Sequence, residues 1–297
     1  MGLVRLMTET FLKYLSSEKR YSKHTTQAYR KDLDQLKTYL SNEFELEDPL
    51  QAKHIHLRGW VVDLTEQGIS PRSINRKVAT LKSFYKFLLS REYIELNPAD
   101  KLKPLKTEKD LPSFVKETEI KALLDRVEFS DDFSGIRDKL LIELFYSTGC
   151  RLSELIGLKE SDVNFYENTL LVLGKRNKER ILPVGDTLIY LIKEYINFKE
   201  DVGMNSKFLM VTDSGKPLYP MFIYRKVKNY LSQVTTLSKK SPHVLRHTFA
   251  THLLNKGADL NAVKDLLGHT SLAATQVYTH NSIDKLKATF DQAHPKA

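Results

Sequence analysis

Residues 169–185 read TLLVLGKRNKERILPVG, and this stretch decides the fold class because its apolar residues are spaced differently from those around it. Two short β-prone runs, at 170–173 and 181–184, flank a turn rich in basic residues. Such runs on either side of a short turn predict a β-hairpin. We therefore expect a small antiparallel sheet within an otherwise helical pattern.

Both flanks of the hairpin have apolar residues at helical spacing. Helices are predicted upstream at 116–127 and 134–149, and downstream at 187–198 and 220–234. Ser241-Pro242 opens a further helix that ends near Gly257, and a short helix ends at Gly268. One helix carrying Tyr278 and a last one at 283–293 complete the pattern. Residues 113–297 are thus predicted to form a mixed, mainly helical domain.

The first hundred residues have helical spacing throughout. A short amphipathic segment covers 8–17, Ser22 caps a helix at 23–40, and a third helix runs from 57 to Gly68. Ser70-Pro71 opens the fourth, with a cap followed by proline at the first helical position. Residues 1–101 are predicted to be an all-helical domain. Residues 102–112, LKPLKTEKDLP, contain two prolines without periodicity and are predicted to be a linker.

Composition sets the broad class. The chain has 297 residues, of which 41% are hydrophobic and 28% charged, which is enough for two domain cores. No apolar run approaches the roughly 20 residues that span a bilayer, and the N-terminus lacks a signal-peptide pattern. We expect a cytoplasmic protein without a membrane partner. The single cysteine, Cys150, excludes an internal disulfide framework and a cysteine-rich metal site.

The net charge of +9 indicates a polyanionic partner. Residues 1–105 carry 18 basic against 13 acidic side chains, and residues 106–297 carry 28 against 24. The excess is therefore +5 and +4. If nucleic acid is the partner, we expect both halves to contact it.

Five side chains in the second half combine the groups that suit a phosphodiester. Arg151 lies in STGCRLSEL, His243 and Arg246 in HVLRHTFATHLL, His269 in LLGH, and Tyr278 nine residues later in SLAATQVYTH. Guanidiniums hold phosphate oxygens through directed N–H groups, an imidazole can transfer a proton, and a phenol can attack phosphorus. Together they predict a tyrosine nucleophile acting on a phosphate.

Taken singly, each of these residues has an ordinary structural interpretation. Arg151 could be a surface charge or a partner of Glu154, and Tyr278 could be a buried aromatic residue. His243 and His247 have the i, i+4 spacing of a zinc pair, but Arg246 places a fixed cation between them and the HExxH glutamate is absent. No metal site is expected. The order and spacing of the whole set favour the phosphate interpretation.

That order, Arg, then His-x-x-Arg, then Gly-His, then Tyr, resembles the tyrosine recombinases, the phage integrase family. The stretches TGCRLSEL, GKRNKER, HVLRHTFATHLL and LLGHTSLAATQVYTH resemble in particular its Xer subgroup, the chromosome-dimer resolvases. The resemblance spans essentially the whole chain. It implies a mainly α fold, with a helical, SAM-like core-binding domain before a mostly helical catalytic domain that contains a small antiparallel sheet.

The resemblance implies roles for the matched positions that hold the phosphate. Arg151 and Arg246 match the two arginines that grip the scissile phosphate. His269 matches the histidine that hydrogen-bonds the same phosphate. Fixed N–H donors of this kind stabilise charge that develops on phosphorane oxygens.

Further matched positions imply the proton transfers and the attack. Lys175, in the hairpin turn, matches the lysine that protonates the leaving 5′-oxygen, and His243 matches the position that assists proton transfer. Tyr278 matches the nucleophile, which would form a 3′-phosphotyrosine that can be religated. Arg176 stands where relatives often have glycine, and it adds charge to the turn without moving Lys175.

Basic residues of the predicted N-terminal helices and of the hairpin turn are candidates for DNA contacts. They are Lys23, Arg30, Arg72, Arg76, Lys82, Arg176 and Lys178. Solvated charges on outer helix faces explain each one equally well. DNA phosphate contacts would make the affinity depend strongly on salt.

The resemblance also implies partners: double-stranded DNA with a specific recombination site, and a tetramer on two DNA sites. The tetramer would contain identical or paralogous subunits joined through the last helix, with a DNA translocase as a potential activator. No two-metal carboxylate cluster or GxxxxGK[ST] loop is present, so we expect neither Mg²⁺ nor ATP and no cofactor.

Three alternatives stay open. A phage or transposon integrase of the same family shares the catalytic residues, although the chain begins too close to its first core helix to hold an arm-binding domain. A type IB topoisomerase shares the chemistry without a specific site. A catalytically silent DNA-binding protein would have no need of Tyr278.

Overall fold

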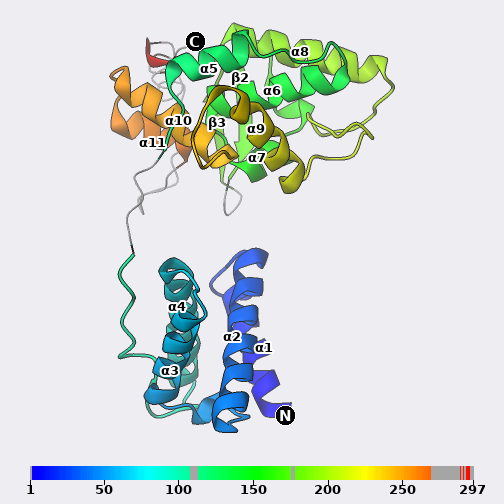
Figure 1. Cartoon of the computed structure of the whole chain (residues 1–297). Helices are drawn as coiled ribbons and strands as arrows, with labels where there is room; N and C mark the ends of the chain where they lie inside the picture. Colours follow the sequence, from blue (N-terminus) through cyan, green and yellow to red (C-terminus); the bar gives the residue numbers. More distant parts are fainter. Residues whose placement is uncertain are drawn as a thin grey trace. The chain divides into compact units, whose positions relative to one another are not determined.

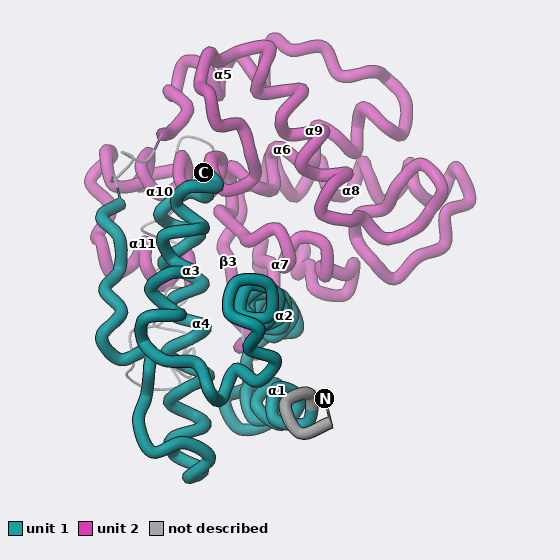
Figure 2. The backbone as a smooth tube through the Cα atoms, turned by 60° about the horizontal axis from the view of Figure 1, so that its bottom comes forward, with its two compact units in different colours: residues 1–110 teal, residues 111–297 magenta. Residues whose placement is uncertain are grey.

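The chain forms two compact units, residues 1–110 and 111–297, in a computed structural model that describes residues 2–107, 113–174, 178–268, 288, 290 and 292–294 (Figure 2). The first unit is helical. The second combines helices with one small sheet, so the mainly α fold class is confirmed. Within the described residues, no helix has the length and apolar character needed to cross a membrane.

Unit 1 contains helices α1 (Gly2–Ser17), α2 (Lys23–Phe44), α3 (His54–Glu66) and α4 (Pro71–Ser90), with a 3₁₀ turn at Pro49–Gln51 (Figure 1). The predicted caps are present. Ser22 accepts a hydrogen bond from the Thr25 N–H at the start of α2, and Ser70 precedes Pro71 at the start of α4. Helix α1 begins at Gly2 and not at residue 8, and α3 begins at His54 and not at residue 57.

A buried carboxylate joins α2 to α4. Asp32 is fully buried and accepts two hydrogen bonds from the Arg76 guanidinium, one of them at 2.8 Å. The Lys77 ammonium lies 3.0 Å from the same carboxylate, and the Thr80 hydroxyl donates to it at 2.8 Å. A buried charge needs such compensation, because desolvation of an ion costs several kcal/mol. This group therefore fixes the two longest helices of unit 1 against each other.

Unit 2 contains seven α-helices and three strands among its described residues (Figure 1). The helices are α5 (Glu117–Asp125), α6 (Phe133–Thr148), α7 (Leu152–Gly157), α8 (Asp186–Asp201), α9 (Pro220–Val234), α10 (Pro242–Asn255) and α11 (Leu260–Leu267), with a 3₁₀ turn at Glu160–Asp162. The strands β1 (Val163–Asn164), β2 (Thr169–Leu173) and β3 (Glu179–Pro183) form an antiparallel sheet in the order β1-β2-β3.

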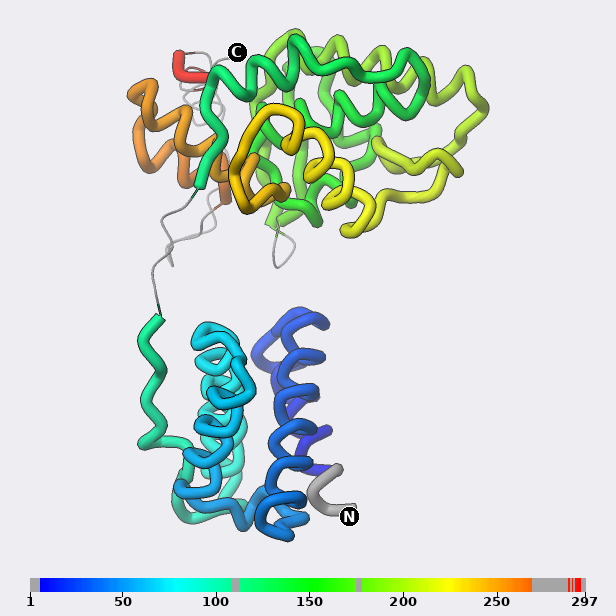
Figure 3. Tube along the Cα trace, in the orientation of Figure 1, coloured from blue at the N-terminus to red at the C-terminus, as the bar shows by residue number. Residues whose placement is uncertain are grey.

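The hairpin predicted from the sequence is β2–β3, with Leu171 opposite Ile181. Strand β1 was not predicted, because two residues are too short to show alternation. Helix α6 is buried along nearly its whole length, and α8 and α10 pack on it to form the core of the unit. Helices α10 and α11 lie side by side (both orange in Figure 3).

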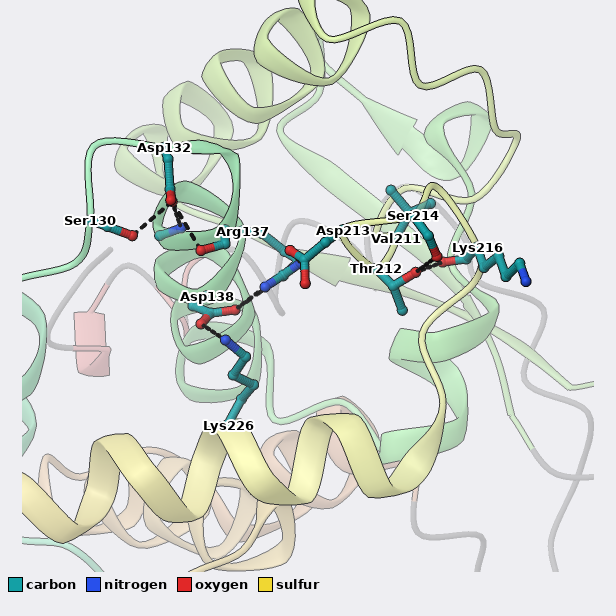
Figure 4. Close-up of polar contacts among 12 residues, drawn as sticks. Ser130, Asp132, Arg137, Asp138, Val211, Thr212, Asp213, Ser214, Lys216 and Lys226 are labelled. Carbon is teal, nitrogen blue, oxygen red and sulfur yellow. Dashed lines mark hydrogen bonds and ion pairs between the residues drawn. The ribbon is translucent and has the colours of Figure 1, made fainter.

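A second ionic network ties α6 to α9 and to the turn at 212–216 (Figure 4). Arg137 is fully buried and donates to Asp138 and to Asp213 in that turn. The other carboxylate oxygen of Asp138 lies 2.7 Å from the Lys226 ammonium and accepts a hydrogen bond from Tyr230 at 3.0 Å. Each buried charge thus has an opposite charge beside it, which is the condition for burying an ion pair.

Part of the chain near the C-terminus packs on its own unit. Phe290 and Ala293 are buried in the core, and the His294 ring stacks on Phe290 with ring centroids 4.6 Å apart. His294 Nε2 also lies 3.3 Å from the Tyr146 carbonyl oxygen. Most of the predicted last helix, 283–293, lies outside the described residues. Its docking onto a neighbouring subunit stays a prediction.

Candidate active site

Helix α10 carries two of the candidate residues. Pro242 occupies its first turn, where a missing N–H is tolerated, and His243 and Arg246 follow at i and i+3 on one face. The His243 side chain is exposed, whereas Arg246 is partly buried. The same helix therefore presents an imidazole to solvent and directs a guanidinium into the unit.

A tight turn between α6 and α7 positions Arg151. Gly149 ends α6 in the left-handed conformation, with φ of 57°. A Cβ at this position would lie 2.4 Å from the Phe249 ring, so only glycine fits between α6 and α10. Arg151 then forms the N-cap of α7, and the Gly149 carbonyl accepts a hydrogen bond from Arg246. This turn brings the two arginines together.

Three arginines converge on the C-terminal end of α11. Arg180 donates to the Leu266 carbonyl at 2.9 Å, Arg246 donates to the Leu267 carbonyl, and Arg151 donates to the Gly268 carbonyl at 2.9 Å. These carbonyls belong to the last turn of the helix, where they have no intrahelical partner and carry the negative end of the helix dipole. The helix end thus holds three cations of the site.

Glu154 provides the carboxylate of this cluster. Its oxygens accept two hydrogen bonds from Arg180, at 2.7 and 2.8 Å, and one from the Arg151 guanidinium at 2.8 Å. The Arg151 backbone N–H donates to it as well, at 2.6 Å. Burial alone would raise the pKa of Glu154, but the hydrogen bonds and charge of Arg180 and the hydrogen bonds of Arg151 outweigh it and lower the pKa to about 2. The carboxylate is therefore ionised at neutral pH.

The cluster has an excess of positive charge. Among the described residues, the cluster contains three guanidiniums, of Arg151, Arg180 and Arg246, and one carboxylate, of Glu154. Burial, followed by the charges of Arg151 and Arg180, lowers the pKa of Arg246 to about 10. Arg246 is still charged at neutral pH, and an added anion would be attracted to this place.

Cys150 lies in the same turn but is not a nucleophile. Its side chain is buried, and burial raises the pKa of the thiol to about 11. A thiol with such a pKa is protonated at neutral pH, and the thiolate is the reactive form.

A surface pocket of about 420 Å³ lies at the start of α10. It is lined by Ser113, Lys239, Lys240, Ser241, His243, Val244 and His247. Lys239 and Lys240 place positive charge in this pocket, beside His243.

Lys175, His269 and Tyr278, together with Arg176, lie outside the described residues. The described residues that precede Lys175 and His269 border the arginine cluster. Gly174 precedes Lys175, and a Cβ on Gly174 would lie 3.4 Å from Glu154 Oε1. Gly268 precedes His269 and accepts the hydrogen bond from Arg151. The structure thus brings Arg151 and Arg246 together, with His243 on the same helix as Arg246.

Sequence reasoning missed Arg180 and considered Glu154 only as a partner of Arg151. Strand alternation holds a signal for Arg180. It is two residues before Leu182 on β3, so both point to the same face, and both are buried. A basic residue on the inward face of a strand indicates a buried ion pair.

The basic residues considered as DNA contacts differ in their surroundings. Arg30 pairs with Glu9, Arg76 pairs with the buried Asp32, and the Lys82 ammonium donates to the Asp100 carbonyl. The remaining described candidates, Lys23, Arg72 and Lys178, are exposed. A role of any of them in binding DNA stays a prediction.

Comparisons with known proteins agree over most of the chain. The model of the phage integrase family matches residues 113–284, and that of the phage integrase N-terminal SAM-like domain matches residues 8–92. Tyrosine recombinase XerC of Chlorobaculum tepidum is 39% identical, over 97% of this chain and 94% of that protein. XerC of Bacillus subtilis is 36% identical, over 100% of this chain and 99% of that protein.

Solved structures show the same fold. XerH site-specific recombinase bound to its palindromic difH substrate, in a post-cleavage complex, aligns with a TM-score of 0.73 at 23% identity, over 95% of this chain and 83% of that one. The Tn1549 transposon integrase in complex with circular intermediate DNA aligns with a TM-score of 0.68 at 21% identity, over 94% of this chain and 97% of that one.

Proposed function

Since the chain belongs to the phage integrase family and is a tyrosine site-specific recombinase, we propose that it cleaves DNA by attack of Tyr278 on the scissile phosphate. The observation that supports this most is the cluster of Arg151 and Arg246 at the end of α11. Each guanidinium has five N–H groups and uses two of them in hydrogen bonds to described residues, and such a pair can bind the two non-bridging oxygens of a phosphodiester. The chain continues from this cluster to His269 and Tyr278.

The proposed cleavage exchanges one phosphate ester for another. The Tyr278 oxygen bonds to phosphorus, the bond from phosphorus to the 5′-oxygen breaks, and a 3′-phosphotyrosine results. The phenolic proton is lost during the attack, with His243 assisting the transfer, and Lys175 protonates the departing 5′-oxygen. Because the number of ester bonds is unchanged, a 5′-hydroxyl from another strand can reverse the step and rejoin DNA.

The phosphorane has more negative charge than the diester from which it forms. A cluster with excess positive charge therefore stabilises the transition state more than the ground state, which is the requirement for catalysis. Loss of a donor of this kind typically slows a reaction by roughly 100- to 1,000-fold. Arg151 and Arg246 are the residues to which we assign this role, and His269 is expected to add a hydrogen bond.

We propose double-stranded DNA with a specific recombination site as the substrate. The resemblance to the Xer recombinases leads us to propose resolution of chromosome or plasmid dimers at cell division, by a tetramer on two sites. The tetramer would contain this chain alone or with a paralogue, and a translocase would activate it. An integrase of a mobile element would use the same chemistry. Footprinting on candidate chromosomal sites and on element ends distinguishes the two roles.

Tyr278→Phe tests the nucleophile. The variant lacks only the attacking oxygen, so we expect it to bind the site as the wild-type protein does and to form no covalent adduct with a nicked duplex. Denaturing electrophoresis detects the adduct. A covalent product formed by Tyr278→Phe would refute the assignment, whatever its DNA affinity.

Deletion of residues 283–297 tests the proposed link between subunits. We expect weaker cooperative binding to paired sites and reduced recombination, with single-site binding kept. Phe290 and Ala293 are buried in the described structure, so the variant must first show a cooperative unfolding transition. A folded variant with unchanged cooperativity and recombination would contradict the proposal.

A further inference from the structure

Arg180 is a buried cation in the arginine cluster, and the proposed reaction assigns it no role. Its side chain is 5% exposed, on β3, and all three of its nitrogens donate within the cluster. Two N–H groups go to the Glu154 carboxylate and one goes to the Leu266 carbonyl. A guanidinium is rarely buried without full compensation, because its desolvation is costly. Each of its nitrogens thus has a hydrogen-bond partner among the described residues.

Through Glu154, Arg180 reaches Arg151. Glu154 Oε1 accepts from both guanidiniums, at 2.7 Å from Arg180 and 2.8 Å from Arg151. Glu154 Oε2 accepts from Arg180 at 2.8 Å and from the Arg151 backbone N–H at 2.6 Å. The position of this carboxylate thus sets both the backbone and the side chain of Arg151. The two parallel bonds from Arg180 fix its plane.

Through Leu266, Arg180 reaches the end of α11. Arg180, Arg246 and Arg151 come from three separate segments, and they donate to the successive carbonyls of Leu266, Leu267 and Gly268. The chain that leaves α11 at Gly268 continues directly to His269. The three hydrogen bonds to this last turn therefore fix the position of Gly268, where the segment that carries the proposed nucleophile begins.

We propose that Arg180 is a positioning residue for DNA cleavage. It acts through Glu154 on the direction of the Arg151 guanidinium, and through Leu266 on the start of the segment that carries Tyr278. The inference rests on the proposed function, because it concerns what aligns the groups of that reaction. Lysine cannot replace Arg180, since one ammonium does not supply two parallel N–H donors and a third donor at a fixed angle.

A purely structural role predicts a different outcome. If Arg180 only neutralised the buried charge of Glu154, the lysine variant would keep that charge and restore activity. If Arg180 aligns its neighbours, both Arg180→Lys and Arg180→Met fail in the chemical step. Arg126→Met is the matched control, because Arg126 is an exposed arginine of the same unit, at the end of α5.

The first measurement uses full-length protein and a nicked duplex built on the sequence that the wild-type protein selects from random duplexes. For each variant, the DNA affinity and the maximal rate of adduct formation at saturating DNA are determined. We expect affinities within about threefold of wild type, because many phosphate contacts contribute to binding. We expect the adduct rate of both Arg180 variants to fall about a hundredfold, as for misplaced reacting groups. A wild-type rate for Arg180→Lys would overturn the proposal.

The second measurement does not depend on DNA. Hydrogen exchange of peptides that cover α11, Leu260–Leu267, should be faster in both Arg180 variants and unchanged in Arg126→Met. Unchanged exchange in all three variants would contradict the proposal. A wild-type protein that formed no adduct on its selected site would instead refute the proposed function, and the exchange result would then decide whether Arg180 holds α11.

Discussion

Arg76 is predicted to act chiefly as the counterion of Asp32, although its sequence makes it a candidate for DNA binding. Its guanidinium makes two hydrogen bonds to a carboxylate that is fully buried. A hydrogen bond to a charged group contributes about 1.5–3 kcal/mol. The Arg76 side chain is 46% exposed, so solvent weakens the interaction, and Asp32 keeps Lys77 and Thr80. We therefore expect Arg76→Ala to destabilise unit 1 by about 1–2 kcal/mol.

The chain offers a local probe for this measurement. It has one tryptophan, Trp60, which is buried in the core of unit 1. Unfolding in urea followed by Trp60 fluorescence therefore reports on this unit. In a unit of this size, a loss of 1 kcal/mol in the free energy of unfolding also lowers the thermal midpoint by about 4 °C. Arg72→Ala is the control, because Arg72 is exposed one turn earlier on the same helix. The free energy of unfolding of Arg72→Ala should differ from that of the wild type by less than about 0.5 kcal/mol.

If Arg72 contacts a DNA phosphate, Arg72→Ala should weaken DNA binding more than Arg76→Ala does, although it destabilises unit 1 less. The loss of Arg72 would then weaken binding and reduce the salt dependence by about one unit of slope. An unchanged unfolding midpoint for Arg76→Ala, with DNA binding as weak as that of Arg72→Ala, would refute the counterion role. Arg76 would then be a DNA contact.

Three further predictions concern unit 2. Glu154→Gln should lower its stability by about 3 kcal/mol at pH 7, because the pKa of Glu154 is lowered from 4.5 to about 2. This stabilisation is lost as the pH falls from 4.5 towards 2, so the free energies of unfolding of variant and wild type should converge near pH 2, and a constant gap would contradict the assignment. Gly149→Ala should destabilise by at least about 1 kcal/mol, through its positive φ and the close Phe249 ring, whereas Gly157→Ala, with open space around it, should be neutral in the same thermal melt. Burial lowers the pKa of His252 below 6.5, so the stability that His252 contributes is present above pH 6.5 and is lost at lower pH. In His252→Gln, the free energy of unfolding should therefore fall less between pH 7 and 5 than in the wild type. An unchanged slope would show that other groups cause this pH dependence.

The features predicted correctly from the sequence are those set by local chemistry. The caps at Ser22 and at Ser70-Pro71 depend on residues within one turn of a helix, and both are found where predicted. The hairpin depends on alternation within two short runs, and it is found as β2–β3. Strand β1 was missed because its two residues pair with β2 without showing a pattern of their own.

The parts of the site that could not be predicted depend on contacts between distant segments. The motifs containing Arg151 and Arg246 indicate guanidiniums for a phosphate, but not that each donates to a carbonyl at the end of α11. Arg180 is 26 residues from Glu154, and no local pattern shows that the two are paired. The same limit applies to Arg76, because a basic residue on a helix can face a phosphate or a buried carboxylate 44 residues away.

The lowered pKa of Arg246 links the architecture of the site to its reaction. The three guanidiniums are held close together by the Glu154 carboxylate and by the carbonyls of α11, and after burial the charges of Arg151 and Arg180 are the next causes of the lowered pKa of Arg246. An entering phosphate relieves part of the repulsion between these charges, and a phosphorane with additional negative charge relieves more. In the proposed reaction, the cluster would therefore stabilise the phosphorane more than the bound diester, so that the interaction contributes to the rate and not only to the binding of DNA.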